Sequence, residues 1–196
     1  MPRLFQLSTN AYVEAAVVPN LSGEAIQATD KEWLDFQNRL VRQLRRAGRS
    51  PDTLPEHLHW HWANKARYYQ GRSGFEFVGL EYDGRTQGLI LLDYTRTGRL
   101  PQQMSQPLVY VDYLASAPWN QRTLTDTPEF KGVGRVLVGV AQKISLERGH
   151  QGRVGLHSLP QSEGFYRDVL GMIDLGTDSQ YHGLRYFELE AEGTER

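Results

Sequence analysis

Residues 129–135 read EFKGVGR and lead directly into an amphipathic segment that ends at Gly149. In that segment apolar side chains recur at the spacing of one helix face; they are Val133, Val136, Leu137, Val140, Ala141 and Ile144. Gly132 and Gly134 carry no Cβ atom, so the backbone there can approach a ligand closely. A glycine turn at a helix N-terminus presents unpaired N–H groups and the positive end of the helix dipole. The stretch is therefore a candidate anion site, and a turn without a ligand is the alternative.

The spacing of the glycines excludes two other phosphate-binding motifs. A dinucleotide fingerprint, G-x-G-x-x-G, would need a third glycine where the chain has Leu137, and no G-x-x-x-x-G-K-[ST] run is present. The pattern that fits Gly132 and Gly134 is Q/R-x-x-G-x-G/A, the pyrophosphate-binding turn of the GNAT superfamily of N-acetyltransferases, which the chain resembles. At the first position Glu129 replaces the usual Gln or Arg, and a carboxylate there disfavours a bound pyrophosphate unless it points away.

Periodicity and turn residues predict an alternating order of strands and helices along the chain. The expected elements are a strand at 11–18, a helix from an N-cap at Asp30 to Ala47, a second helix within 51–74, strands at 75–82 and 88–94 joined by Asp83-Gly84, a buried strand at 107–118, a polar loop at 118–131, the helix after the glycine turn, a strand at 153–159, a short helix at 161–171, and a final hairpin of 172–176 with 184–191. The tail after Ala191 is expected to be frayed.

The order of these expected elements resembles the GNAT acyl-CoA N-acyltransferase fold over residues 11–190. The resemblance implies an α/β fold with a mixed central sheet flanked by helices, in one domain that spans residues 1–196.

A second family signature is partly retained. The late N-x-x-A-x-x-x-Y…G-F pattern of GNAT proteins has its tyrosine at Tyr166. Leu159 stands where Asn is usual, Ser162 stands where Ala is usual, and the distance from Tyr166 to Gly171 is one residue longer than the common spacing. The resemblance implies that Tyr166 is the general acid that protonates a departing CoA thiolate, and a core aromatic role is the alternative.

The resemblance also implies acetyl-CoA as the cofactor and assigns residues to hold it. The turn would bind the pyrophosphate through backbone N–H groups, with Lys131 or Arg135 adding a charged contact; its residues are Lys131, Gly132, Val133, Gly134, Arg135 and Val136. Backbone N–H groups at Leu114 and Ala115 would face the thioester carbonyl. The acceptor would be an amine of a small molecule or of a polypeptide.

An amine acceptor must lose a proton, so the site needs a base. Asp112 is the first candidate, because it is embedded in an apolar strand where burial raises the pKa of a carboxyl group. His157 and then Glu81 are the alternatives. Each also has an ordinary structural explanation: Asp112 could be satisfied by backbone or tyrosine hydroxyl groups, and His157 could be packed or capping.

Composition limits the other possibilities. The 196 residues carry 22 basic and 23 acidic side chains, so no nucleic-acid partner is expected. The absence of Cys excludes disulfides, thiolate nucleophiles and Cys metal sites. The alternating His57, His59 and His61 lack a second ligand cluster, so no metal is expected. The N-terminal apolar run is too short for a signal peptide or a membrane span, so we expect a cytoplasmic protein.

Two functional alternatives remain open at this point. One is a GNAT-fold module that binds CoA or a partner without catalysis, which the altered Glu129 and the lost asparagine keep in view. The other is a toxin-type acetyltransferase of aminoacyl-tRNA, which the balanced charge disfavours. Aromatic residues at 60, 62 and 119 suggest an acceptor pocket or a core, and a homodimer is possible for this fold.

Overall fold

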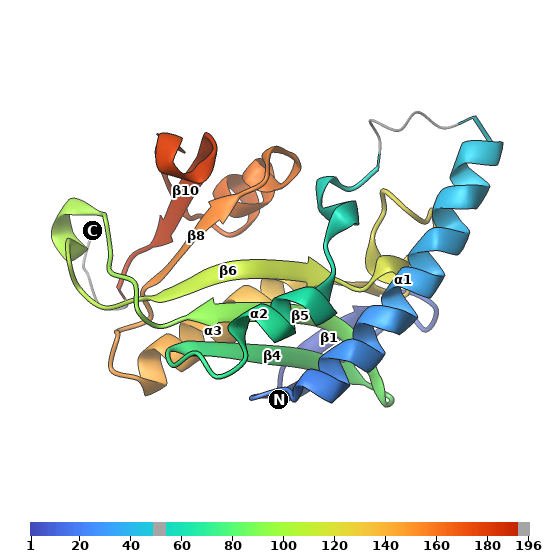
Figure 1. Ribbon diagram of the computed structural model, residues 1–196, viewed down its shortest axis with the longest axis horizontal. Coiled ribbons are helices and arrows are strands. Elements are labelled where there is room, and N and C mark those ends of the chain that lie inside the picture. Colours follow the sequence, from blue (N-terminus) through green and yellow to red (C-terminus); the bar gives the residue numbers. More distant parts are fainter. Residues whose placement is uncertain (49–53, 192–196) are drawn as a thin grey trace.

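The computed structural model describes residues 1–48 and 54–191 of the chain (Figure 1). Its central sheet has these strands: β3 (Ala16–Val18), β4 (Phe75–Tyr82), β5 (Arg85–Asp93), β6 (Val109–Ser116), β8 (Val154–Ser158), β9 (Ile173–Asp178) and β10 (Leu184–Leu189). Their order is β3-β4-β5-β6-β8-β10-β9, and within this sheet the β6–β8 pair is parallel whereas the other pairs are antiparallel. The predicted α/β fold with a mixed sheet is confirmed. The tail predicted to fray after Ala191 lies outside the described residues.

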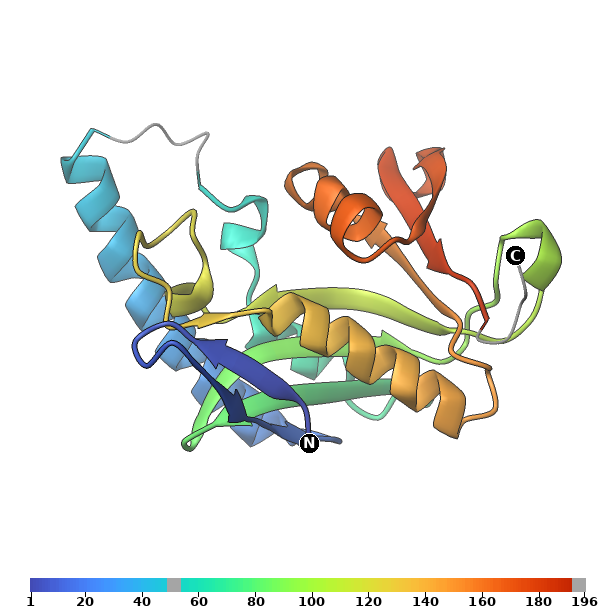
Figure 2. The ribbon, with the colours of Figure 1, turned by 180° about the vertical axis from the view of Figure 1, so that it is seen from behind.

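Helices cover both faces of this sheet. They are α1 (Gly23–Arg46), α2 (Trp62–Tyr69) and α3 (Val133–Glu147). In β5, Leu89 and Leu91 pack in one cluster with the tryptophans of α1 and α2, whereas Ile90 and Leu92 pack in another with α3. Successive strand side chains point to opposite faces, so a strand buried on both faces is apolar throughout. Figures 1 and 2 show α1 and α2 on one side of the sheet and α3 on the other. Within the described ranges, no helix is both long and apolar enough to cross a lipid bilayer.

The hairpin predicted from the Asp83-Gly84 pair is confirmed. It joins β4 to β5, and its two central residues have positive φ angles of 50° and 71°. Asp and Gly tolerate this left-handed region, which is the backbone geometry that matches the twist of a tight hairpin.

The first helix begins earlier than the sequence predicts. Its N-cap is Ser22, whose hydroxyl accepts a hydrogen bond from the Ala25 N–H at 3.1 Å. Asp30 lies inside α1 with only 5 % of its surface exposed, and its carboxylate accepts the Trp62 N–H at 2.8 Å. The prediction that Asp30 caps α1 is therefore wrong, because the side chain caps the first turn of α2 instead. His61, the N-cap residue of α2, provides no side-chain cap of its own.

Replacing Asp30 with alanine is expected to lower the free energy of unfolding by about 1–3 kcal/mol, because the buried Trp62 N–H loses its acceptor. Asp30→Asn retains an oxygen at the same place and should lose less. Asp35→Ala, on the same helix, removes an exposed pair with Lys31 and should leave stability unchanged. Urea denaturation of the variants measures these differences. Equal midpoints for Asp30→Ala and Asp35→Ala would contradict the capping role.

The N-terminal strand prediction needs a correction. Residues 11–18 form two strands instead of one, because the chain leaves one sheet for another at the buried Ala15, whose N–H donates to the Pro2 carbonyl. The first part belongs to a small sheet of β1 (Arg3–Gln6), β2 (Ala11–Glu14) and β7 (Phe130–Lys131). The polar loop predicted at 118–131 therefore ends in a short strand.

The short helix predicted at 161–171 has a different form. A 3₁₀ turn at Pro160–Ser162 precedes a π-helical turn at Phe165–Val169. In the π turn the Leu170 N–H donates to the Phe165 carbonyl, five residues earlier. The predicted single helix is thus replaced by two irregular turns.

Candidate active site

Strands β6 and β8 separate partway along their length. Their parallel pairing ends at Val111 and Leu156. On the other side of β6, Asp112 is the extra residue of a β-bulge, between the residues that pair with Leu92 and Leu91 of β5. A bulge bends its strand. Beyond this point β6 diverges from β8 and β10, as Figure 1 shows.

A cleft of about 250 Å³ lies where the two strands diverge. Six of the residues predicted for the site line it: Asp112, Leu114, Ala115, Gly134, His157 and Tyr166. They come from β6, the first turn of α3, β8 and the π-helical turn. The other predicted residues, which adjoin Gly134 in the sequence and do not line the cleft, are Lys131, Gly132, Val133, Arg135 and Val136.

The glycine turn has the geometry of an open helix N-terminus. Gly132 is the N-cap of α3, and glycine has no side chain that could cap the helix. Its φ of 88° and ψ of 3° define a left-handed conformation that favours glycine. The first helical hydrogen bond runs from the Val136 N–H to the Gly132 carbonyl at 2.9 Å. The preceding amides of Val133, Gly134 and Arg135 are the ones that a helix leaves without internal partners. The Val136 N–H already has a partner within the helix, so the three amides before it are the ones that would bind an anion.

At Gly134 the backbone of the turn lies close to side chains that line the cleft. A Cβ atom at this position would lie 3.3 Å from the Phe165 ring and 3.9 Å from Leu114. At Gly132 a Cβ atom would meet nothing within 4 Å, so the space beside the turn is open. Arg135 links the glycine turn to the π-helical turn, since its guanidinium donates to the Val169 carbonyl at 3.3 Å.

Glu129 is engaged by an arginine from another strand. Its carboxylate pairs with the Arg85 guanidinium at 3.4 Å, and the same guanidinium bonds to Glu32 at 3.1 Å and lies over the Trp119 ring at 3.9 Å from its centre. The carboxylate that departs from the GNAT pattern is thus engaged by an ion pair. The positive charge of Arg85 partly offsets the negative charge that would oppose a bound anion.

Leu114 and Ala115 lie beyond the end of the β6–β8 pairing. They pair with Ile90 and Leu89 on the β5 side. On the β8 side, no strand among the described residues pairs with this part of β6, because the β6–β8 pairing ends at Val111. Backbone groups of β6 here border the cleft and can bond to a ligand.

Asp112 is a half-buried carboxylate that another helix holds in place. The Tyr69 hydroxyl of α2 donates a hydrogen bond to its Oδ2 atom. Burial raises the pKa of Asp112 above its ordinary value of 3.8, and the Tyr69 bond partly opposes that rise. A carboxylate with a raised pKa in a cleft is suited to exchange protons with a ligand.

His157 is held on both sides. Its Nδ1 atom lies 2.7 Å from the Tyr110 hydroxyl, its Nε2 atom lies 3.1 Å from Asp178 Oδ2, and its ring stacks on Tyr181 at 3.8 Å. Only 2 % of the side chain is exposed, and burial lowers the pKa of the imidazole. Both ring nitrogens are therefore engaged, which leaves His157 unable to act as the predicted base without breaking these bonds. Glu81, the third candidate, pairs with Ala16 in β3 and does not line the cleft.

Tyr166 is buried in the wall of the cleft. Its ring contacts those of Phe165 and Phe187, at centroid distances of 5.2 Å and 5.9 Å. None of the hydrogen bonds found among the described residues involves its hydroxyl group, and burial raises its pKa to about 12. The hydroxyl is thus protonated at neutral pH and available to a ligand in the cleft.

The cleft also contains residues that the sequence did not assign to the active site. Among the described residues, no hydrogen-bond partner is found for the buried His57 Nε2 and Gln121 Oε1 atoms, and both side chains line the cleft. Burial lowers the pKa of His57 to about 4, so the ring is neutral. Over the described part of the chain, no cluster of His, Asp and Glu side chains is placed to hold a metal ion.

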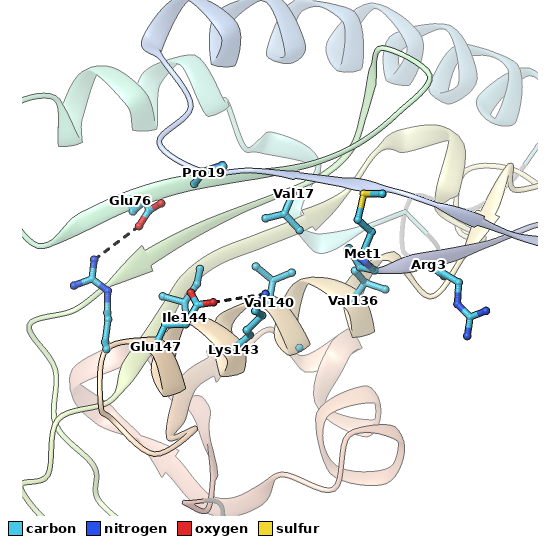
Figure 3. Close-up of a pocket in the computed structure, with 13 residues that line it drawn as sticks. Met1, Arg3, Val17, Pro19, Glu76, Val136, Val140, Lys143, Ile144 and Glu147 are labelled. Atoms are coloured by element: carbon cyan, nitrogen blue, oxygen red, sulfur yellow. Dashed lines mark ion pairs between the residues drawn. The ribbon is translucent and has the colours of Figure 1, made fainter.

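A larger groove of about 800 Å³ lies elsewhere, between α3 and the N-terminal residues (Figure 3). Val136, Gly139 and Val140 face it, on the side of α3 opposite to Gly134 and the cleft. Ion pairs from Lys143 to Glu147 and from Arg148 to Glu76 join residues that line it. The groove includes none of the residues that surround the splayed strands.

Comparisons with known proteins find similarity in structure and not in sequence. No family model matches the chain, and no curated protein sequence matches it. A GNAT-family protein from Desulfovibrio desulfuricans superposes with a TM-score of 0.57 at 12 % identity, over 90 % of this chain and 99 % of the other.

Two further solved structures agree. A GCN5-related N-acetyltransferase from Rhodopseudomonas palustris gives a TM-score of 0.55 at 16 % identity, over 90 % and 95 % of the two chains. The PaiA N-acetyltransferase from Thermoplasma acidophilum, solved in complex with coenzyme A, gives 0.54 at 14 % identity, over 91 % and 99 %. Because the sequence identities are this low, the similarity establishes only the fold. The chain has the fold of the GNAT N-acetyltransferases, which confirms the resemblance predicted from the glycine turn and the order of elements.

Proposed function

We propose that the chain is an acetyl-CoA-dependent N-acetyltransferase that acetylates a primary amine of a small molecule or a polypeptide. One observation carries this proposal: Gly134 in the first turn of α3, the part of β6 beyond its pairing with β8, and Tyr166 all border one cleft. The similar protein from Thermoplasma acidophilum was solved with coenzyme A. Acetyl-CoA supplies an activated acetyl thioester.

The turn fits a diphosphate. The amides of Val133, Gly134 and Arg135 would bind its oxygens at the positive end of the α3 dipole, and the open space beside Gly132 leaves room for the group. The exposed side chains of Lys131 and Arg135 would add charged contacts.

The edge of β6 fits the developing oxyanion. Backbone N–H groups at Leu114 or Ala115 would stabilise negative charge on the acetyl oxygen, and one well-placed donor contributes about 3 kcal/mol. In the transfer the amine nitrogen bonds to the acetyl carbon, and the carbon–sulfur bond breaks. Tyr166 would give its hydroxyl proton to the departing sulfur.

Asp112 would take the proton from the amine, directly or through water. An alkyl amine with a pKa of about 10.4 costs roughly 4.6 kcal/mol to deprotonate at pH 7, so a base in the cleft is required. We assign this role to Asp112 in preference to His157, whose ring nitrogens are both engaged.

The proposal is tested by thermal denaturation with and without acetyl-CoA, followed by a CoA-release assay with a panel of amines. Acetyl-CoA at 100 times its dissociation constant should add about 2.7 kcal/mol of stability. No stabilisation at millimolar acetyl-CoA would refute cofactor binding. Stabilisation without CoA release from any amine would favour the alternative of a non-catalytic CoA-binding module, which the lost asparagine supports.

Tyr166→Phe is expected to lower kcat by about ten- to a hundredfold, because the variant keeps the buried ring and loses the proton donor. Acetyl-CoA affinity should be unchanged. Phe165→Leu, which alters the neighbouring ring and leaves the hydroxyl in place, is the control for packing. If Tyr166→Phe turns over at the wild-type rate, Tyr166 has no part in the mechanism.

A further inference from the structure

Lys65, on α2, holds its ammonium group against aromatic rings. The Nζ atom lies 3.3 Å from the centre of the Tyr113 ring and 4.8 Å from the centre of the Trp60 ring. These two rings meet edge to face at 4.9 Å. Among the described residues, no carboxylate forms an ion pair with Lys65, although Asp112 and Asp30 attract it from farther away. The half-buried ammonium is thus positioned by cation–π contacts and lacks a direct counter-ion.

A hollow of about 640 Å³ opens beside Lys65. Its aromatic walls are Trp60, Tyr68, Tyr69 and Tyr113. Trp60 and Tyr113 also line the cleft between β6 and β8, so the hollow adjoins the proposed site of transfer at these two rings. Tyr69 joins the two spaces as well, since its hydroxyl bonds to Asp112.

We propose that this hollow is the acceptor subsite, and that the acceptor is an amino acid or a similar amine that carries a carboxylate and an aromatic side chain. The inference rests on the proposed acetyltransferase function. Lys65 binds the carboxylate, the aromatic walls contact the side chain, and the amine faces Asp112. The ammonium of Lys65 and the carboxylate of Asp112 then match the opposite charges of the acceptor.

The charges at this site favour a carboxylate over a second cation. The aromatic faces of Tyr113 and Trp60 that would bind a cationic ligand are already occupied by Lys65. Burial lowers the pKa of Lys65 to about 8, and the more distant Asp112 and Asp30 partly oppose that fall. A carboxylate beside the ammonium would form a direct ion pair with it, whereas an amine with two or more positive charges would be repelled.

The experiment compares acceptors that differ only in the carboxylate: L-phenylalanine with 2-phenylethylamine, and L-tyrosine with tyramine. Wild-type kcat/KM, measured by CoA release, should be about ten- to a hundredfold higher for the amino acid of each pair, mainly through KM. Lys65→Met should abolish this preference, and Lys65→Arg should retain it. Lys31→Met is the matched control, because Lys31 is exposed on α1 and pairs with Asp35.

Equal activity toward both members of each pair, unchanged in Lys65→Met, would overturn the inference and leave the transferase intact. Faster turnover of a polyamine such as spermidine than of either amino acid would overturn it too. Thermal melting of each variant separates loss of the fold from loss of the preference.

A second readout does not depend on catalysis. Titration with N-acetyl-L-phenylalanine should change the tryptophan fluorescence through Trp60, and N-acetyl-L-phenylalaninamide should bind about tenfold more weakly. The difference should vanish in Lys65→Met. If no amine releases CoA, the proposed function fails while this titration still decides the subsite: equal binding of the acid and the amide overturns it.

Discussion

Asp112→Asn is expected to lower kcat by at least about a hundredfold, with little change in acetyl-CoA affinity. General-base catalysis contributes about 10²–10⁴ to the rate, and the amide cannot accept the amine proton. Asparagine keeps the size of the side chain and an oxygen that the Tyr69 hydroxyl can bond to, so the bulge should survive. Steady-state rates and an acetyl-CoA titration of both proteins measure the two effects. A variant as active as the wild type would contradict the role of Asp112.

The pH dependence provides an independent check. Burial raises the pKa of Asp112, and the base acts in its ionised form, so kcat should fall as the pH falls through this raised value. The hydrogen bond from Tyr69 lowers the pKa of Asp112. Tyr69→Phe removes that bond and should move the acidic limb of the profile to higher pH. An acidic limb that does not move in Tyr69→Phe would show that another group titrates.

Gly134→Leu is expected to abolish acetyl-CoA binding, with the dissociation constant at least a hundredfold weaker. A Cβ atom at Gly134 already lies 3.3 Å from the Phe165 ring, and the rest of a leucine side chain would fill the passage between the turn and the cleft. The substitution also crowds the first amides of α3. Isothermal titration measures the affinity directly.

Gly139→Leu is the matched control on the same helix. A Cβ atom at Gly139 meets nothing within 4 Å, and this residue faces the groove on the other side of α3. This variant should bind acetyl-CoA as the wild type does and gain about 2.7 kcal/mol of stability at 100 times the dissociation constant. Equal binding by Gly134→Leu and Gly139→Leu would place the cofactor outside the cleft.

Local patterns in the sequence predict the central elements well. The Asp83-Gly84 turn defines a hairpin because its conformational demand is local. The glycine turn and the apolar stripe of α3 likewise depend on neighbouring residues. Residues 88–94 and 107–118 read as strands because both faces of the sheet are covered by helices.

Features that depend on distant contacts could not be predicted in this way. Asp30 has the residue type of an N-cap, yet it caps α2, which lies 32 residues farther along the chain. His157 reads as a possible base, but Tyr110 and Asp178 engage its ring from other strands. The engagement of Glu129 by Arg85 and the placement of Tyr69 beside Asp112 are contacts of the same kind. Only the folded chain brings these partners together.

The central claim is that the free amides at the beginning of α3 bind the diphosphate of acetyl-CoA. The most direct measurement is a titration of the ¹⁵N-labelled protein with coenzyme A, in which the chemical shifts of the backbone amides are monitored by NMR. We expect the largest shifts at Val133, Gly134 and Arg135, with smaller shifts at Leu114 and Ala115. Shifts confined to residues of the α3 groove, such as Gly139 and Lys143, or no shifts at all, would contradict the claim.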